Sequence, residues 1–303
     1  MAAWVVWAAW AAWTCKCPGP AVLAAAEPAK TPHGLRPAGF FVDNLFMNIT
    51  PNSQVLTELE SYKCYLASKY LSIKHSSYFQ VYDEMFASYR GKPIVFVEIG
   101  VLNGGSLFMW RDYFGPQARI IGIDLNPEAK KWQTEGFEIH IGNQADPVFW
   151  HEFFEKVGMV DVILDDGGHT NEQQITTTIG TIPHIKDGGL LMVEDVHASY
   201  MRQFSNPSKY SFVNFSKHVV DIVNSRFSKI RTSGNPLRSM VYSLNFFESI
   251  VCFRVDRQRC FVSIPTSNNG LSANAQDFYQ HTSPSRGLRA KLRNFHLRRF
   301  FRD

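Results

Sequence analysis

Residues 97–106 read Val-Glu-Ile-Gly-Val-Leu-Asn-Gly-Gly-Ser, and this stretch decides the fold class. Its first residues end an apolar run, and a helical pattern follows over residues 105–114. A glycine-rich turn between a strand and a helix lets a ligand approach backbone amides. We therefore expect a cofactor at this turn, with Gly100, Gly104 and Ser106 along it.

Outward from this turn, short apolar runs alternate with helical patterns. The runs lie at residues 94–99, 119–125, 138–141, 161–165 and 189–194, and the helical patterns at 105–114, 127–134, 147–156 and 171–184. This alternation predicts an α/β fold, a Rossmann-like doubly wound and mostly parallel sheet with helices on both faces. A helix is expected over about 207–229. Antiparallel strands at the edge of the sheet are expected from the apolar runs at 240–247, 250–255 and 260–264.

Two further strand ends carry residues suited to an adenosine cofactor. Asp124 ends the second strand, 26 residues after Glu98, where an acid can bind ribose hydroxyls. The third strand leads into Asn143, Gln144 and Asp146, which are expected to face the adenine ring across the same crevice.

NAD is the rival cofactor, because its binding motif also pairs a glycine turn with a later acid. Leu102 replaces the glycine that admits the diphosphate, and Glu98 would repel it. A sulfonium and an amino-acid ammonium would instead attract the Glu98 carboxylate. An NAD-linked oxidoreductase and a non-catalytic scaffold protein stay open as alternatives, as does a turn that is only structural.

Four acids follow the fourth and fifth strands: Asp165 and Asp166 in Leu-Asp-Asp-Gly-Gly-His, and Glu194 and Asp195 in Val-Glu-Asp-Val-His. If these strands are adjacent and parallel, their carboxyl ends lie about 5 Å apart. Carboxylates this close repel each other unless a proton or a cation intervenes. Oxygen ligands favour Mg²⁺ or Mn²⁺ over Zn²⁺. The alternative is that one acid of each pair caps a helix or stays hydrated.

His169 lies three residues after Asp166, in the turn that faces the acids. An imidazole there can accept a hydroxyl proton, so we expect His169 to be the general base. His197 is either a supporting residue of the same site or purely structural.

These motifs resemble the metal-dependent sugar O-methyltransferases of macrolide biosynthesis and the related rhamnosyl O-methyltransferases. The resemblance covers about residues 92–200. It implies a class I fold, S-adenosylmethionine as methyl donor and a small-molecule hydroxyl acceptor such as a glycoside. It also implies Asp166, Glu194 and Asp195 as Mg²⁺ ligands, His169 as base, and Glu98, Gly100, Asp124 and Gln144 along the cofactor. Asp165 is expected beside the cofactor as well.

The chain divides into four predicted segments. An apolar leader and Pro/Ala-rich linker at 1–39 precede a helical segment at 40–91, in which two helices are expected between 53 and 90. The methyltransferase domain is expected at 92–270, and a basic tail at 271–303. Residues 1–13 are shorter than a membrane-spanning helix, and a secretory signal is left open, so the compartment stays unknown.

Charge is concentrated at the C-terminus. The net charge of +4 comes from the tail, because residues 286–303 hold seven of the 31 basic residues and one of the 27 acidic residues. The rest of the chain is nearly neutral, which argues against nucleic-acid binding. The tail is expected to form a basic amphipathic helix that touches anionic membranes, with disorder as the alternative. A homo-oligomer is left open.

Overall fold

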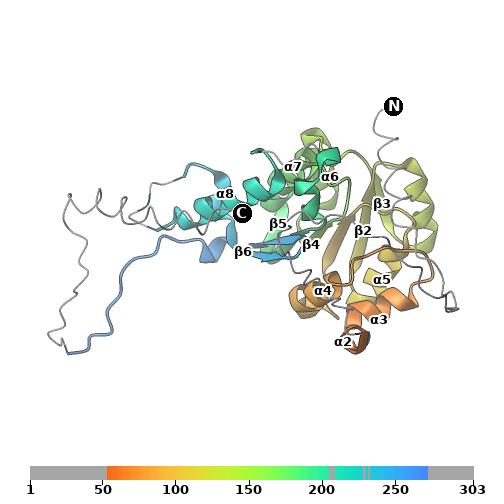
Figure 1. Cartoon of the computed structure of the whole chain (residues 1–303), viewed down its shortest axis with the longest axis horizontal. Coiled ribbons are helices and arrows are strands. Elements are labelled where there is room, and N and C mark those ends of the chain that lie inside the picture. The colour runs from red at the N-terminus through yellow and green to blue at the C-terminus, as the bar shows by residue number, and fades with distance from the viewer. Residues whose placement is uncertain (1–52, 205–208, 228–229, 231–232, 272–303) are drawn as a thin grey trace, which may run out of the picture. The chain divides into compact units, whose positions relative to one another are not determined.

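A single seven-stranded sheet organises the protein (Figure 1). The computed structural model describes residues 53–204, 209–227, 230 and 233–271. The strands lie side by side in the order β3-β2-β1-β4-β5-β7-β6. Their bounds are β1 Val95–Ile99, β2 Arg119–Asp124, β3 Glu138–Ile141, β4 Val160–Asp165, β5 Ile185–Val193, β6 Val241–Phe247 and β7 Ile250–Val255.

The sheet has a parallel part and an antiparallel edge. Strands β1 to β5 pair in parallel, and β7 and β6 continue the sheet in antiparallel register beyond β5. The central strands are apolar on both faces because helices cover both. The predicted Rossmann-like fold, mostly parallel with antiparallel edge strands, is therefore confirmed.

Helices cover the two faces of the sheet with separate apolar cores. On one face, α4 (Tyr78–Phe86) and α5 (Gly105–Phe114) pack aromatic side chains against the strands, and Trp110 is fully buried among them. On the other face lie α6 (Pro147–Val157), α7 (Asn171–Thr181) and α8 (Phe212–Asn224), with Trp150 and Phe212 in the core. The strand ends between these layers are where polar groups gather.

The segment before the first strand is helical, as expected, but it is divided differently. Helices α2 (Ser53–Glu58) and α3 (Glu60–Ala67) are separated by Leu59, and α4 follows after residues 68–77, which form no helix. The aromatics Tyr78, Phe79 and Tyr82 on α4 are buried in the core.

One local prediction is wrong. Residues 260–264 form no strand, because β6 and β7 already end the sheet and residues 261–264 are exposed. The helical pattern predicted at 127–134 is present as a 3-10 helix, η2 (Pro127–Glu135), with Asn126 capping its first turn.

The leader, the linker and the basic tail lie outside the described residues, so their predictions stay untested. All described residues belong to one unit that spans Ile49–Asp303. Among the residues the structure describes, no helix has the length and apolar character needed to cross a membrane. The limits of the predicted segments stay predictions.

Candidate functional site

The candidate site lies where β1, β4 and β5 end. The backbone N–H of Asp166 donates to the carbonyl of Ile99 at 3.0 Å, and that of Glu194 donates to the carbonyl of Asp165 at 2.9 Å. The turn after β1 and both acidic pairs are thus joined by backbone hydrogen bonds. Because parallel strands end at the same edge, the sheet brings together residues almost 100 positions apart.

The turn after β1 needs its glycines. Gly100 has φ +93°, and a Cβ there would lie 2.1 Å from the carbonyl oxygen of Asp166. Gly104 has φ +78°, and a Cβ there would lie 2.3 Å from the Trp132 ring. A side chain is therefore excluded at both positions by strain and by contact. The predicted cofactor turn and the acidic cluster are in direct contact.

Glu98 is fully buried at the end of β1. Its carboxylate accepts hydrogen bonds from Ser106 Oγ at 2.8 Å and from Trp110 Nε1 at 3.0 Å, both on α5. Burial raises the pKa of Glu98 to about 7. The predicted cofactor residues Glu98 and Ser106 therefore bind each other in this structure, and their contact with a cofactor stays a prediction.

Asp124 turns its carboxylate toward the same turn. Its Oδ2 accepts from the backbone N–H groups of Val101 at 2.9 Å and Leu102 at 3.1 Å, and its Oδ1 accepts from Asn126 at 2.8 Å. The acid therefore closes the turn, which places it beside the predicted cofactor site without testing a ribose contact.

The three residues predicted after β3 have different surroundings. Gln144 is buried, donates to Asp165 Oδ1 at 2.9 Å and accepts from the Gly168 N–H at 2.9 Å. Asn143 and Asp146 are exposed, and Asp146 caps α6 by accepting from Val148 N–H at 2.9 Å. Gln144 is thus the member of the three that joins the acidic cluster, whereas Asp146 has the role of a helix cap.

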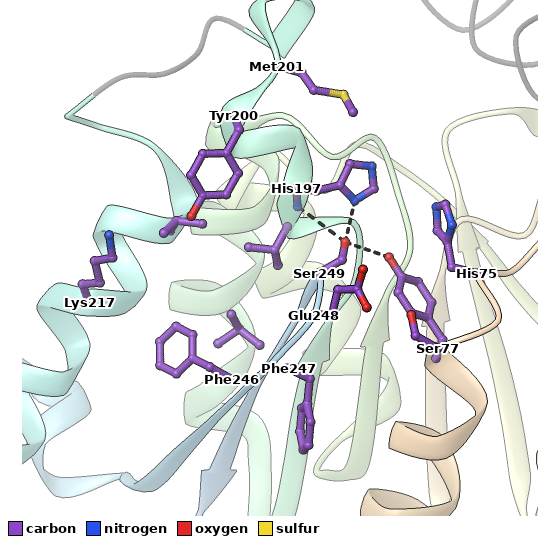
Figure 2. Close-up of a pocket in the computed structure, with 14 residues that line it drawn as sticks. His75, Ser77, His197, Tyr200, Met201, Lys217, Phe246, Phe247, Glu248 and Ser249 are labelled. Carbon is purple, nitrogen blue, oxygen red and sulfur yellow. Dashed lines mark hydrogen bonds between the residues drawn. The ribbon is translucent and has the colours of Figure 1, made fainter. Parts of the chain in front are cut away.

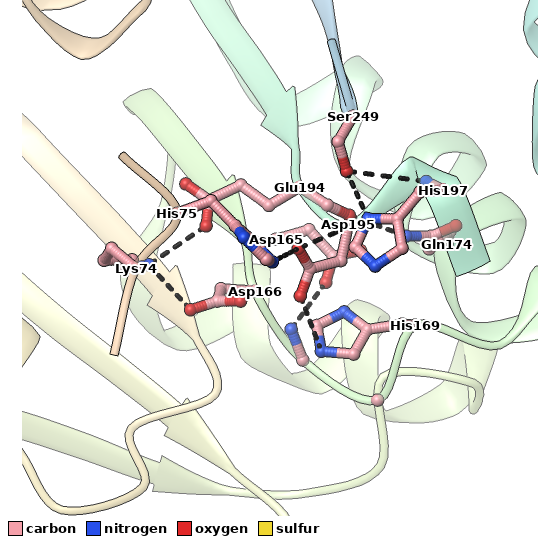
Figure 3. A network of polar contacts seen from close by, with 12 residues as sticks. Lys74, His75, Asp165, Asp166, His169, Gln174, Glu194, Asp195, His197 and Ser249 are labelled. Atoms are coloured by element: carbon pink, nitrogen blue, oxygen red, sulfur yellow. Dashed lines mark hydrogen bonds and ion pairs between the residues drawn. The ribbon is translucent and has the colours of Figure 1, made fainter. Parts of the chain in front are cut away.

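Asp166 and Glu194 share one buried cation (Figure 3). Lys74 Nζ lies 2.6 Å from Asp166 Oδ2 and 3.0 Å from Glu194 Oε2, and the lysine side chain is 2% exposed. Tyr82 donates to the other Glu194 oxygen at 2.5 Å. Burial raises the pKa of Glu194 to about 8, although Lys74 acts in the opposite direction. Both oxygens of this predicted metal ligand therefore already have partners.

Asp195 faces histidines on two sides. Its Oδ2 lies 3.4 Å from His169 Nε2, and its Oδ1 lies 3.9 Å from both His75 Nε2 and His197 Nδ1. Tyr78 also donates to Oδ1, at 2.5 Å. Burial alone would raise the pKa of Asp195, but His169 and Tyr78 bring it below its ordinary value. The residue also adopts a left-handed backbone conformation, with φ +54°.

Two groups of side chains have the spacing that could hold a metal ion. One comprises Asp166, His169 and Asp195, whose ligand atoms lie within 4.8 Å of one another, and the other comprises His75, Asp195 and His197. Two predicted ligands, Asp166 and Asp195, are therefore brought together with the predicted base His169. Glu194 lies outside this group, next to Lys74, so its role as third ligand stays a prediction.

A pocket of about 660 Å³ is lined by Tyr78, His75 and His197, which flank Asp195 (Figure 2). Its polar end holds His75, His197 and Ser249, and a hydrogen bond of 2.5 Å joins Ser249 Oγ and His197 Nδ1. Burial lowers the pKa of His197. Apolar side chains form most of the remaining wall, among them Val196, Met201, Val213, Phe246 and Phe247.

Sequence reasoning missed Lys74, His75 and the tyrosine hydroxyls. Along the sequence, Lys74 and His75 lie between two helices and do not follow a strand, so no motif indicated them. Tyr78 and Tyr82 are buried in the core, and their hydroxyls also reach Asp195 and Glu194. A buried tyrosine usually finds a partner for its hydroxyl, which is the signal that could have indicated this.

Comparisons with known proteins agree with the motifs. A family model described as a methyltransferase domain matches residues 97–196. The 8-demethyl-8-alpha-L-rhamnosyl tetracenomycin-C 2'-O-methyltransferase of Streptomyces olivaceus is 29% identical over 168 residues, which are 50% of this chain and 44% of that protein. Demethylmacrocin O-methyltransferase of Streptomyces fradiae is 31% identical over 171 residues, 52% of this chain and 43% of that protein.

A solved structure supports the same likeness. MycE methyltransferase from the mycinamycin biosynthetic pathway, in complex with Mg, SAH and mycinamycin VI, is 26% identical with a TM-score of 0.59. The match covers 70% of this chain and 55% of that chain. The chain thus spans about half the length of the relatives it matches. Its fold is that of a class I methyltransferase, and the predicted resemblance to S-adenosylmethionine-dependent sugar O-methyltransferases is confirmed.

Proposed function

We propose that this protein is an S-adenosylmethionine-dependent, divalent-metal-assisted O-methyltransferase that acts on a hydroxyl group of a sugar or a similar small molecule. The observation that carries the proposal is the direct contact between the glycine turn at Gly100 and the backbone of Asp166. A methyl donor at the turn and an acceptor at the acids would therefore lie next to each other.

The acidic cluster fits a divalent cation by its charge. Five carboxylates gather here, those of Glu98, Asp165, Asp166, Glu194 and Asp195, and Lys74 pairs with two of them, Asp166 and Glu194. Among the described residues, Asp165 Oδ2 is buried without a hydrogen-bond partner. Buried carboxylates that lack compensation favour a bound cation of the hard, oxygen-preferring type. We propose Asp166 and Asp195 as ligands of Mg²⁺ or Mn²⁺, with Glu194 as the third.

His169 is the proposed base. Its Nε2 faces Asp195 Oδ2 at 3.4 Å, so the carboxylate orients the ring. The bound cation would lower the pKa of the acceptor hydroxyl. With the methyl donor bound, His169 would accept the hydroxyl proton as the acceptor oxygen bonds to the methyl carbon, and the carbon–sulfur bond would break to leave S-adenosylhomocysteine. Gln144, Glu98 and Asp124 are proposed to surround the methyl donor, with Asp165 held in place by Gln144.

The acceptor is proposed to enter the pocket beside Asp195. Its apolar wall suits the aglycone of a glycoside, and its polar end, with His75, His197 and Ser249, suits the sugar hydroxyls. The relatives' names support this class: one is a rhamnosyl tetracenomycin-C methyltransferase, and the MycE structure contains mycinamycin VI. The matching of a methyltransferase family model weighs against NAD-linked oxidation and against a scaffold role.

The test is methyl transfer from labelled S-adenosylmethionine to a panel of glycosides and catechol-like compounds, with products identified by mass spectrometry. We expect a methylated glycoside whose formation stops in excess chelator and returns with Mg²⁺ or Mn²⁺. Full activity in chelator would reject the metal-assisted mechanism. Absence of S-adenosylmethionine binding, measured by equilibrium dialysis, would reject the function altogether.

Contact of the basic tail with anionic membranes and self-association of the chain are proposed only from the sequence. Vesicle sedimentation with and without residues 286–303, and light scattering of the full chain, would test them.

A further inference from the structure

Lys74 is a buried cation that the proposed reaction leaves without a role. Its ammonium contacts Asp166 Oδ2 and Glu194 Oε2 and lies 5.9 Å from the centre of the Tyr82 ring. These two oxygens belong to residues proposed above as metal ligands. Figure 3 shows the lysine entering the cluster from the side opposite His197.

The backbone on either side of Lys74 is anchored to the rest of the site. Ser68 Oγ donates to the carbonyl of Gly105 at 2.7 Å, and Tyr65 donates to the carbonyl of Ser72 at 3.2 Å. After the lysine, Tyr78 donates to Asp195. The ammonium is therefore positioned by its backbone, in contrast to a surface lysine that reaches a carboxylate by chance.

Burying an ammonium is unfavourable unless carboxylates compensate for lost hydration, and here two of them do. The same two carboxylates would repel each other without a cation between them. Lys74 thus supplies one positive charge to the side of the cluster formed by Asp166 and Glu194. On the other side of Asp166, the Asp195 carboxylate faces histidines, and the described contacts give it no lysine or arginine.

We propose that Lys74 is a built-in counter-cation, which holds Asp166 and Glu194 together when no divalent metal is bound and competes with the metal for their oxygens. This inference rests on the proposed metal-assisted function. If the Lys74 ammonium stays in place when a divalent cation binds, the two positive charges repel each other. If the ammonium moves away, it loses its contacts with the two carboxylates. In both cases Lys74 weakens metal binding, and the site exchanges its metal more readily than carboxylates alone would allow.

The test is a titration of the full chain with Mn²⁺ followed by electron paramagnetic resonance, in which free and bound Mn²⁺ are counted directly. We expect Lys74→Met to bind Mn²⁺ about tenfold more tightly or better, because the competing charge is gone. Lys74→Arg, which keeps the charge, should bind as wild type does. Lys186→Met is the matched control, because it removes a lysine paired with Asp161 at 2.8 Å at the other end of β5.

Thermal unfolding followed by circular dichroism gives a second readout. In chelator, Lys74→Met should melt below wild type because two buried carboxylates have lost their partner, and Mn²⁺ should raise its melting temperature more than that of wild type. If Lys74→Met does not fold in chelator, Lys74→Gln, which keeps one donor for Asp166, serves for the same comparison.

The outcomes separate this inference from the proposed function. Metal-dependent methyl transfer, with Mn²⁺ affinity unchanged or weaker in folded Lys74→Met, overturns the inference and leaves the function. Mn²⁺ binding by Lys74→Met but not by wild type supports the inference and contradicts metal assistance. Absence of binding by both proteins overturns both.

Discussion

Charged side chains are arranged differently at the two ends of the parallel strands. At the amino end, acids pair with basic residues near the surface: Asp161 with Lys186 at 2.8 Å, Glu138 with Arg119 at 2.7 Å, and Asp187 with Arg257 at 2.7 Å. At the carboxyl end, five buried or half-buried carboxylates gather, and Lys74 pairs with two of them, Asp166 and Glu194. Partly exposed ion pairs of the first kind contribute little to folding stability, whereas a buried charge without a partner is strongly destabilising. The destabilisation caused by these buried carboxylates indicates that the carboxyl end binds a ligand.

The largest effect should come from the base at the carboxyl end. His169→Ala should lower the methyl-transfer rate by ~10²–10⁴, the usual worth of a general base, while the affinity for Mn²⁺ and S-adenosylmethionine is kept. Single-turnover kinetics and titrations measure the two separately. An equivalent change at the amino end, Arg257→Ala, should leave the rate unchanged. Equal rate losses in both variants would erase the proposed difference between the ends.

Stability against pH should depend on Glu98. Its folded pKa of about 7 lies above the ordinary value of 4.5, so the folded chain keeps a proton that the unfolded chain loses between these values. Stability from this group is complete below pH 4.5 and is lost as the pH rises to about 7, by about 3 kcal/mol at most.

Glu98→Gln should remove this dependence, because glutamine can accept from Trp110 and donate to Ser106 without ionising. Urea unfolding in chelator at several pH values between 5 and 8 measures it. Parallel curves for wild type and Glu98→Gln would show that the carboxylate is ionised throughout.

Asp124→Ala should weaken S-adenosylmethionine binding by about 1.5–3 kcal/mol, the range for hydrogen bonds to a charged group. The loss includes the backbone contacts to Val101 and Leu102, which hold the glycine turn. Isothermal titration calorimetry measures the dissociation constant, and Asp187→Ala is the control because Asp187 pairs with Arg257 at the amino end of the sheet. An unchanged constant in Asp124→Ala would remove Asp124 from the cofactor site.

The smallest effect is expected at the amino end. Lys186→Met should cost less than about 1 kcal/mol of unfolding free energy, because its pair with Asp161 is partly exposed and screened by salt. Urea unfolding at low and high salt checks this. A cost above about 2 kcal/mol would show that the amino end is also under strong electrostatic control.

Sequence patterns predict the parallel sheet, the glycine turn and the acidic pairs, because strand ends and short motifs are local features. Strand periodicity places Glu98, Asp165 and Glu194 at one edge with no knowledge of their partners. It could not reveal that residues 260–264 leave the sheet, because an apolar run does not show whether a neighbouring strand is present.

Only the tertiary structure decided the partners within the cluster. Lys74 reaches Asp166 and Glu194 across 92 and 120 positions of sequence. Tyr82 and Gln174 are likewise brought to Glu194 by packing of α4 and α7 on the sheet. Side-chain hydrogen bonds and burial, which fix the charge of each acid, depend on contacts between distant segments. Local sequence therefore identified which acids form the site, and the packing decided which of them already hold a cation.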